Sequence, residues 1–229
     1  MASAASLQVV CLLDVLGFES LLRRIGLAAL QTKYDALVGY VKEQKGGIDI
    51  VPTPDGHVAV GWLAVGNVYF SDTLLFWTQY STMSLPSFTQ LVAETICFGL
   101  ELGLPLRGAI AAGEAVLDSG AGVFLGEALI EAARTEREQQ WIGVSFGPSF
   151  SREGRGAGFY LHTVLPYKSQ YKDLSSEYAT GMTVDWPRHW REPLFSSFLI
   201  ASQLQGKKVQ LSIAALYQFT CAGDNSGTT

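Results

Sequence analysis

The chain has 229 residues, enough for one large domain or two small ones; 48% of them are hydrophobic and 16% are charged. This composition is typical of a globular protein with a buried core and excludes an intrinsically disordered chain. A net charge of −5 gives no indication of the basic surface that nucleic-acid binding requires, although local donors can still bind a small anionic ligand.

Apolar residues in the first half of the chain follow strand-like runs and one helical pattern. In chain order they predict a strand at 9–13, a helix from 18 to about 44, a turn at 51–56 and strands at 57–65 and 67–77. Gly66 lies between the last two runs and predicts a tight hairpin turn there. The run 67–77 is then a single strand, interrupted by Asp72.

The second half alternates strands with further helices. In chain order we expect a helix at 86–103, one or two strands at 104–118, a helix at 126–140, a strand at 141–146, a loop at 151–158, two late strands and a short helix at 195–205. Hairpins mixed with helical crossovers predict a single α+β domain whose mostly antiparallel sheet is flanked by helices. We expect a core at about 9–190 and a C-terminal extension at 191–229.

Membrane and disulfide signals are absent from the sequence. Apolar stretches are interrupted before they reach the length of a membrane span, and no basic residue precedes the first strand as in a secretory signal. Cys11, Cys97 and Cys221 are odd in number and far apart, with no metal-type spacing. We therefore expect reduced thiols in the cytoplasm and no membrane partner.

Two carboxylates occupy unusual positions. Asp14 ends a strand built for the core, and Asp72 interrupts another apolar run. Two strands that are neighbours in a sheet could bring these groups together, where they would repel unless a cation lay between them. Carboxylate oxygens favour Mg²⁺ or Mn²⁺, and two such ions can promote a phosphoryl displacement. Taken alone, Asp14 is better explained as a strand-end or cap residue.

The turn after Asp14 offers a site for phosphate. Leu16, Gly17 and Phe18 lie at the expected start of a helix. Backbone N–H groups at a helix start bind phosphates well. We therefore expect these three residues to contact a phosphorylated substrate.

Four segments resemble the class III nucleotidyl cyclase catalytic domain in order and spacing. They are DVLGF at 14–18, FSDTLLF at 70–76, LRGAIAAGEAV at 106–116 and GEALIEAARTE at 126–136. In that order they look like the family's D-x-x-G-F first metal motif, its second metal strand, its R-x-G-I-x-x-G strand and its G-x-x-x-N-x-A-x-R helix. The resemblance implies a ferredoxin-like α+β fold and one nucleotidyl cyclase catalytic domain over residues 1–229.

The resemblance also implies a set of site residues. Two Mg²⁺ or Mn²⁺ ions would be bound by Asp14, Val15 and Asp72. The protein would be a homodimer with active sites between the protomers, and Arg134 would reach across to the phosphates at the partner's metal site. Arginine suits developing phosphoryl charge because it is permanently charged and has several donors.

Without the resemblance, Arg134 and Arg107 have simpler interpretations. Arg134 could be a solvated helix residue that pairs with Glu131 or Glu138 at near-helical spacing. Arg107 lies in an expected strand, and we expect it to be structural and to pair within the fold.

The sequence departs from the family pattern at three substrate-binding positions. Ile130 stands where the family helix carries an asparagine that is thought to orient the ribose. Val68 and Val123 stand where purine cyclases carry a lysine and a polar residue. A purine would find no hydrogen-bond partner at either valine, which disfavours ATP and GTP.

Segments at 131–145, 164–170 and 183–187 resemble the pyrimidine cyclases of bacterial anti-phage Pycsar systems. This resemblance implies that UTP is converted to 3′,5′-cyclic UMP and pyrophosphate, with CTP and cyclic CMP as the alternative. It also implies a separate effector that responds to the product. Lys168 lies where a triphosphate-binding lysine could lie, although a surface lysine explains it equally well.

Two further interpretations stay open. A degenerate cyclase domain would bind a nucleotide or partner without turnover, which Ile130 favours and the retained Asp14, Asp72 and Arg134 oppose. A different two-metal enzyme, such as a diguanylate cyclase or polymerase, would need an acidic signature loop or a basic track for a template strand. The sequence shows neither.

Overall fold

The computed structural model describes residues 4–43, 48–52, 58–62, 64–81, 84–150, 160–162 and 182–191. Four expected features lie outside these residues. They are the loop at 151–158, Lys168, the short helix at 195–205 and the C-terminal extension beyond 191.

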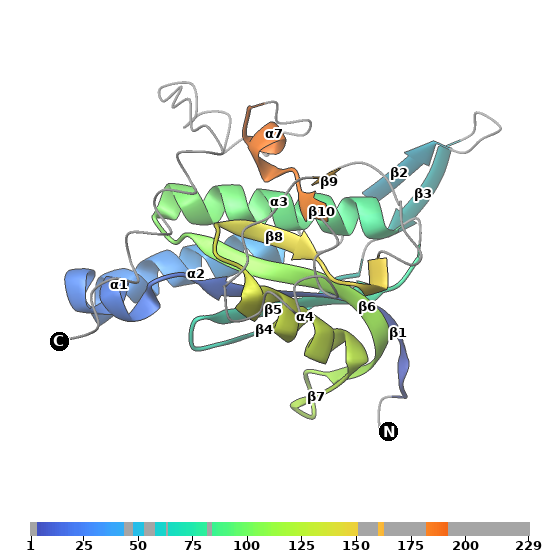
Figure 1. Ribbon diagram of the computed structural model, residues 1–229, viewed down its shortest axis with the longest axis horizontal. Helices are drawn as coiled ribbons and strands as arrows, with labels where there is room; N and C mark the ends of the chain where they lie inside the picture. The colour runs from blue at the N-terminus through green and yellow to red at the C-terminus, as the bar shows by residue number, and fades with distance from the viewer. Residues whose placement is uncertain are drawn as a thin grey trace.

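An eight-stranded sheet forms the centre of the fold (Figure 1). Its strands are β1 (Ser6–Val15), β4 (Gly66–Phe70), β5 (Thr73–Gln79), β6 (Leu106–Asp118), β7 (Val123–Gly126), β8 (Gly143–Phe146), β9 (Tyr160–His162) and β10 (Met182–Val184). They are ordered β4-β5-β1-β6-β8-β10-β9, and β7 pairs with β6. All described pairs are antiparallel except β6 with β8, which confirms the predicted mostly antiparallel sheet.

A separate two-stranded ribbon lies outside this sheet. It consists of β2 (Ile48–Pro52) and β3 (Val58–Trp62), which pair antiparallel. Figure 1 shows the ribbon projecting from the side of the fold.

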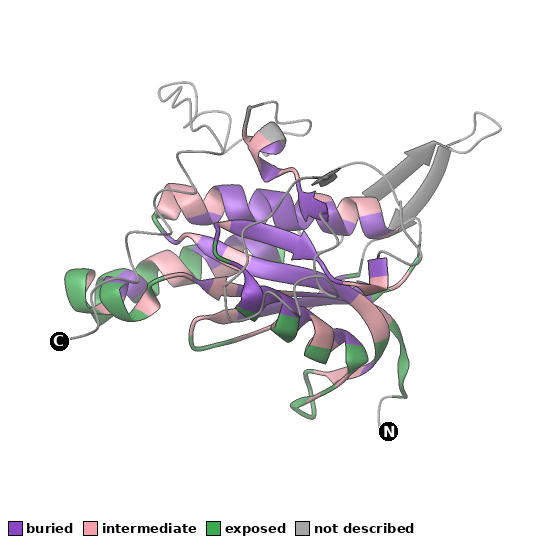
Figure 2. Ribbon diagram, viewed as in Figure 1, coloured by how far each residue is buried: buried purple, intermediate pink, exposed green. Residues whose placement is uncertain are grey.

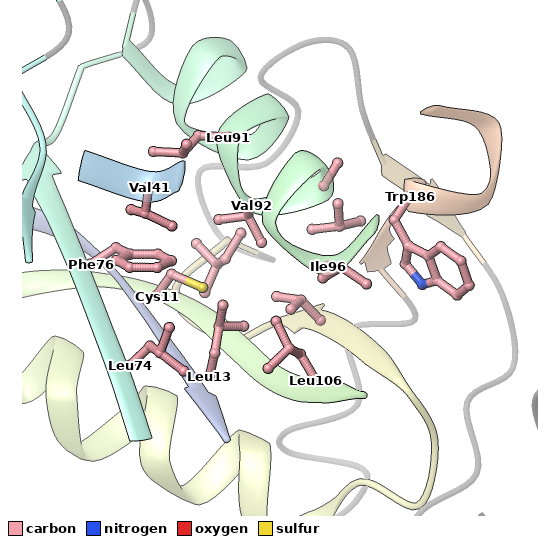
Figure 3. Packing of buried hydrophobic residues seen from close by; sticks show 14 of the residues in the cluster. Cys11, Leu13, Val41, Leu74, Phe76, Leu91, Val92, Ile96, Leu106 and Trp186 are labelled. Carbon is pink, nitrogen blue, oxygen red and sulfur yellow. The ribbon is translucent and has the colours of Figure 1, made fainter. Parts of the chain in front are cut away.

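Helices cover both faces of the large sheet. They are α1 (Phe18–Ile25), α2 (Leu27–Glu43), α3 (Ser84–Leu102), α4 (Glu127–Glu138) and α7 (Trp186–Arg191). The larger hydrophobic cluster joins one sheet face to α2 and α3, as Figure 3 shows. A smaller cluster joins the other face to α4. Among the described residues, every helix is too short or too polar to cross a membrane.

Side-chain alternation along β1 decides which face carries Asp14. Residues 9, 11, 13 and 15 are buried in the cluster beneath α2 and α3. Val10 and Leu12 belong to the cluster beneath α4. Because successive strand residues point to opposite faces, Asp14 falls on the α4 side.

The expected hairpin at Gly66 is wrong. The turn is instead formed by Ser71 and Asp72, between β4 and β5, so the run 67–77 is two paired strands. The glycine at position 66 has a different explanation, because a Cβ there would clash with the Trp77 ring, which packs over it. Apolarity on both sides of Asp72 made the two strands look like one.

The expected single helix at 18–44 is also wrong, because it is two helices. Gly26, with a φ of 78°, ends α1 and separates it from α2. Glycine adopts this positive φ without the steric cost that a Cβ would bring.

Candidate functional site

The structure brings Asp14 and Asp72 together. In the antiparallel register of β1 and β5, Asp14 lies opposite Thr73, the residue after Asp72. The Val15 backbone N–H donates a 3.0 Å hydrogen bond to the Asp72 carbonyl. The β4–β5 turn is thereby fixed against the end of β1, and two carboxylates from distant parts of the sequence become neighbours.

The surroundings of Asp14 disfavour its charged form. Burial is the largest cause that raises the pKa of Asp14, and the nearby Asp72 charge raises it further. A 2.7 Å hydrogen bond from the Thr73 hydroxyl to Asp14 Oδ1 lowers the pKa, as does the charge of Arg107. The pKa of Asp14 remains above its ordinary value on balance, so a cation at this site would relieve a real electrostatic cost.

The pair fits a hard divalent cation. Both groups supply carboxylate oxygens and both are only partly exposed. Oxygen ligands of this kind suit Mg²⁺ and Mn²⁺. Within the described ranges, no group of three or more His, Cys, Asp or Glu residues gathers around one point. Ions at this site would therefore need backbone, water or substrate oxygens as their remaining ligands.

Val15 lies beside the acidic pair but cannot contribute its side chain. That side chain is 3% exposed and packs in the large hydrophobic cluster on the opposite sheet face. Only the backbone of Val15 remains as a source of metal ligands.

The turn after β1 offers fewer phosphate donors than the sequence suggested. The Leu16 N–H donates a 2.8 Å hydrogen bond to the Pro105 carbonyl, so it is already used. Gly17 adopts a left-handed conformation, with a φ of 68°, as the N-cap of α1. The first N–H groups of a helix have no intrahelical partner, so Gly17 and Phe18 are the donors left for an anion.

Two residues missed by the sequence reasoning connect α2 to the acidic pair. The Tyr34 hydroxyl lies 3.4 Å from the Thr73 carbonyl, to which it donates. Burial, followed by the charges of Asp72 and Asp14, raises the pKa of Tyr34 to about 12. Thr73 could have been noticed as the neighbour of Asp72, whereas Tyr34 carries no sequence signal because it lies within an ordinary helical pattern.

The structure separates the two valines that replace the purine-binding residues. Val68 lies opposite Leu75 on β5 and contacts the α4-side cluster, the face that carries Asp14. Val123 pairs with Asp118 at the far end of β6 from Arg107, the residue opposite Asp14. One protomer therefore does not place both valines beside the acidic pair.

Arg134 and Ile130 point away from their own sheet. The residues of α4 that are buried include Ala128 and Ala132, which pack on the sheet. Arg134 is exposed, and Ile130 is 55% exposed. Figure 2 shows both buried and exposed parts along α4. The charges that shift the pKa of Asp14 are those of Asp72 and Arg107, and Arg134 is not among them.

Arg107 has the structural role predicted for it. Its guanidinium Nε donates a 2.6 Å hydrogen bond to the Glu136 carboxylate, and Nη1 donates to the Gln139 carbonyl at 3.2 Å. Arg107 therefore holds the end of α4 against the sheet.

An open hollow of about 860 Å³ lies elsewhere, at the far end of β5 from Thr73. Its lining includes Gln8, Trp77 and Gln79 but neither Asp14 nor Asp72. We place the candidate site at the acidic pair because the charges and hydrogen bonds converge there.

Several solved nucleotidyl cyclase structures are distantly similar to this chain. A bacterial light-regulated adenylyl cyclase aligns with 90% of this chain and 58% of its own length, at 9% identity and a TM-score of 0.45. The adenylyl cyclase CyaB from P. aeruginosa aligns over 66% and 82% of the two chains, at 11% identity and a TM-score of 0.42. The catalytic core of a rhodopsin-guanylyl cyclase with converted specificity, in complex with ATPαS, aligns over 75% and 93%, at 12% identity and a TM-score of 0.48. No protein-family model and no curated protein matches the sequence.

Proposed function

We propose that this protein is a class III nucleotidyl cyclase that converts a pyrimidine nucleoside triphosphate, UTP in preference to CTP, into its 3′,5′-cyclic monophosphate and pyrophosphate. The observation that carries the proposal is the closeness of Asp14 to Asp72, the residue that precedes Thr73, the register partner of Asp14 on β5. Two repelling, partly buried carboxylates are costly in a fold that has no use for a cation there.

The reaction joins the ribose 3′-oxygen to the α-phosphorus while the bond from that phosphorus to pyrophosphate breaks, and the hydroxyl proton is released to water. When bound, two Mg²⁺ or Mn²⁺ ions would supply the acidity of the 3′-hydroxyl and offset the triphosphate charge. Asp14, Asp72 and the Val15 backbone would hold these ions. The N–H groups of Gly17 and Phe18 would orient the phosphates at the start of α1.

A second protomer would complete the site. Arg134 is exposed on α4, which supports a role at a partner's substrate rather than at its own chain's acidic pair. Its permanent charge and several N–H donors suit the charge that develops on phosphoryl oxygens. The homodimer would also allow Val68 of one chain and Val123 of the other to border one base.

The proposed preference for a pyrimidine base follows from the lack of a hydrogen-bonding side chain at Val68. Val68 offers no hydrogen bond to a purine edge, and it lies with Leu12 and Leu75 on the face that carries Asp14. Each polar group of the base left buried and unpaired costs about 1–3 kcal/mol, so a larger purine loses more than a pyrimidine does. Cyclic UMP or cyclic CMP would then signal to a separate effector during anti-phage defence.

A degenerate domain that binds nucleotide without turnover is the second candidate. Ile130 favours it, since this exposed side chain cannot hydrogen-bond to a ribose. Retention of the acidic pair and Arg134 favours turnover.

The test is to incubate the purified protein with ATP, GTP, CTP and UTP at equal concentration with Mn²⁺ and to identify the products by mass spectrometry. Cyclic UMP is the expected main product, and the Asp72→Asn variant should make none. Dominant cyclic AMP or cyclic GMP would refute the pyrimidine preference. Tight UTP binding without any cyclic product would favour the degenerate domain.

A further inference from the structure

We infer that Thr73 is a positioning residue that fixes the Asp14 carboxylate for metal binding, and that Tyr34 supports Thr73 from helix α2. The inference rests on the proposed function in that it assigns a cation to the acidic pair. It goes beyond that function by explaining what orients the first ligand.

The contact between Thr73 and Asp14 is direct and short. The Thr73 hydroxyl donates to Asp14 Oδ1 at 2.7 Å, well within the range of a strong O–H···O bond. The two residues lie opposite each other in the β1–β5 register, so the backbone already brings their side chains to the same face. In the part of the chain that the structure describes, Thr73 is the one side chain that donates a hydrogen bond to this carboxylate.

This bond does two things for a metal site. It limits rotation of a carboxylate that is only partly buried and would otherwise sample several orientations. It also occupies only Oδ1, which leaves Oδ2 as an acceptor for a cation. Threonine suits this task because its branched Cβ restricts the torsion that aims the hydroxyl.

Tyr34 extends the same support to the backbone. Its hydroxyl donates to the Thr73 carbonyl at 3.4 Å, and its ring packs edge-on against Phe18, with centroids 6.4 Å apart. A bond of this length is near the limit for a useful hydrogen bond. We therefore expect the contribution of Tyr34 to metal binding to be smaller than that of Thr73.

Thr73→Val and Thr73→Ser separate positioning from strand packing. Valine keeps the shape and the β-branched Cβ of threonine but removes the hydroxyl. Serine keeps the hydroxyl and removes the methyl group. If Thr73 only filled space in β5, the valine variant would behave like the wild type and the serine variant would be the weaker one.

The experiment measures Mn²⁺ binding to the full chain without nucleotide, from the electron paramagnetic resonance signal of free Mn²⁺. Removing a residue that hydrogen-bonds to a metal ligand commonly weakens metal binding by about 10–100-fold. We expect Thr73→Val to weaken Mn²⁺ binding by about tenfold. Thr73→Ser should stay within about threefold of the wild type, Tyr34→Phe should lie between the serine and valine variants, and Asp14→Asn should bind least. Urea unfolding of each variant checks that the fold is retained.

The possible results distinguish the role of Thr73 from the proposed cyclase activity and from the metal assignment. Equal Mn²⁺ affinity of Thr73→Val and wild type would overturn the inference even if the wild type is an active cyclase. A wild type that binds Mn²⁺ through Thr73 and Asp14 but forms no cyclic nucleotide would refute the proposed function and leave the inference standing. Absence of Mn²⁺ binding by the wild type would overturn the inference together with the metal assignment.

Discussion

Arg107 lies directly opposite Asp14 in the register between β6 and β1, yet its guanidinium binds Glu136 on α4 at 2.6 Å. The same side chain therefore serves two parts of the molecule. Its hydrogen bonds hold α4 on the sheet, while its charge lowers the pKa of Asp14. Assembly of the α4 layer and electrostatics of the acidic pair are linked through this residue.

Replacing Arg107 should destabilise the fold more than replacing an exposed arginine. Arg107→Ala removes a largely buried ion pair with Glu136, whose side chain is 8% exposed, and a hydrogen bond to the Gln139 carbonyl, and we expect a loss of about 3 kcal/mol in the free energy of unfolding. The control is Arg23→Ala, which removes a pair with Glu19 whose side chains are both 77% exposed. That control should change stability by less than about 0.5 kcal/mol. Equal losses in urea unfolding would contradict the structural role of Arg107.

Mixing two inactive variants tests whether Arg134 acts across a dimer. Asp72→Ala and Arg134→Ala should each be inactive as homodimers. After subunit exchange at equal amounts, activity should return to about a quarter of the wild-type value, because half of the dimers are mixed and each contains one intact site. Product formation is followed by mass spectrometry, with exchange verified by tags of different mass. Absence of recovery despite verified exchange would place Arg134 outside the partner's site.

A methyl group at Gly66 should be costly. A Cβ there would clash with the Trp77 side chain, so Gly66→Ala should lower the free energy of unfolding by about 2 kcal/mol. Gly39 in α2 is the matched control, since a Cβ there meets nothing within 4 Å. Gly39→Ala should raise stability by about 0.5–1 kcal/mol because alanine favours the helix. Thermal and urea unfolding of both variants decide the comparison.

The turn that carries Asp72 contains a strained residue. Ser71 has a φ of 54°, the one positive φ of a non-glycine residue in the described ranges. Ser71→Gly should remove the steric cost of its Cβ and raise stability by about 0.5–1 kcal/mol after the entropy cost of glycine is subtracted. Ser71→Ala keeps the Cβ and should show no gain in urea unfolding. A gain of equal size in both variants would mean that the serine hydroxyl, rather than φ, is the source of the strain.

Stability should fall as the pH drops below about 6.5, partly because of His189. This residue is 3% exposed, and burial lowers its pKa from the ordinary value of 6.5. The Glu94 carboxylate lies 3.9 Å from its Nε2, but burial also raises the pKa of Glu94, so we expect both groups to resist ionisation. Below pH 6.5 His189 is protonated in the unfolded chain but stays neutral in the folded protein. Protonation therefore favours the unfolded state.

His189→Gln should reduce this pH dependence when urea unfolding at pH 7.5 is compared with unfolding at pH 5.5. Glu94 acts in the opposite direction, because the folded state binds its proton first as the pH falls. If the free energy of unfolding depends on pH in the variant as it does in the wild type, His189 does not stay neutral in the folded state.

Several features of this protein could be predicted from local sequence patterns. Strand and helix positions from 84 to 146 agree with the expected elements to within a few residues, except that strand β7 was not predicted. Long segments with a regular apolar period indicate which of their residues are buried. Asp14 was recognisable because a carboxylate at the end of an apolar strand is costly. Arg107 was recognisable as a structural residue for the same reason, as a charge within a buried strand needs a partner.

The arrangement of the candidate site depends on contacts between residues far apart in the sequence. The β1–β5 pairing brings Thr73 to Asp14 across 59 positions of sequence, and no local pattern encodes which strands become neighbours. Asp72 lies in a turn and not within a strand because β4 pairs with β5, and a hydrogen bond from the Val15 N–H fixes that turn against the end of β1. A contact with Pro105 occupied the Leu16 amide. These outcomes depend on strand register, which is set by burial of one sheet face over the whole domain rather than by the residues around each site.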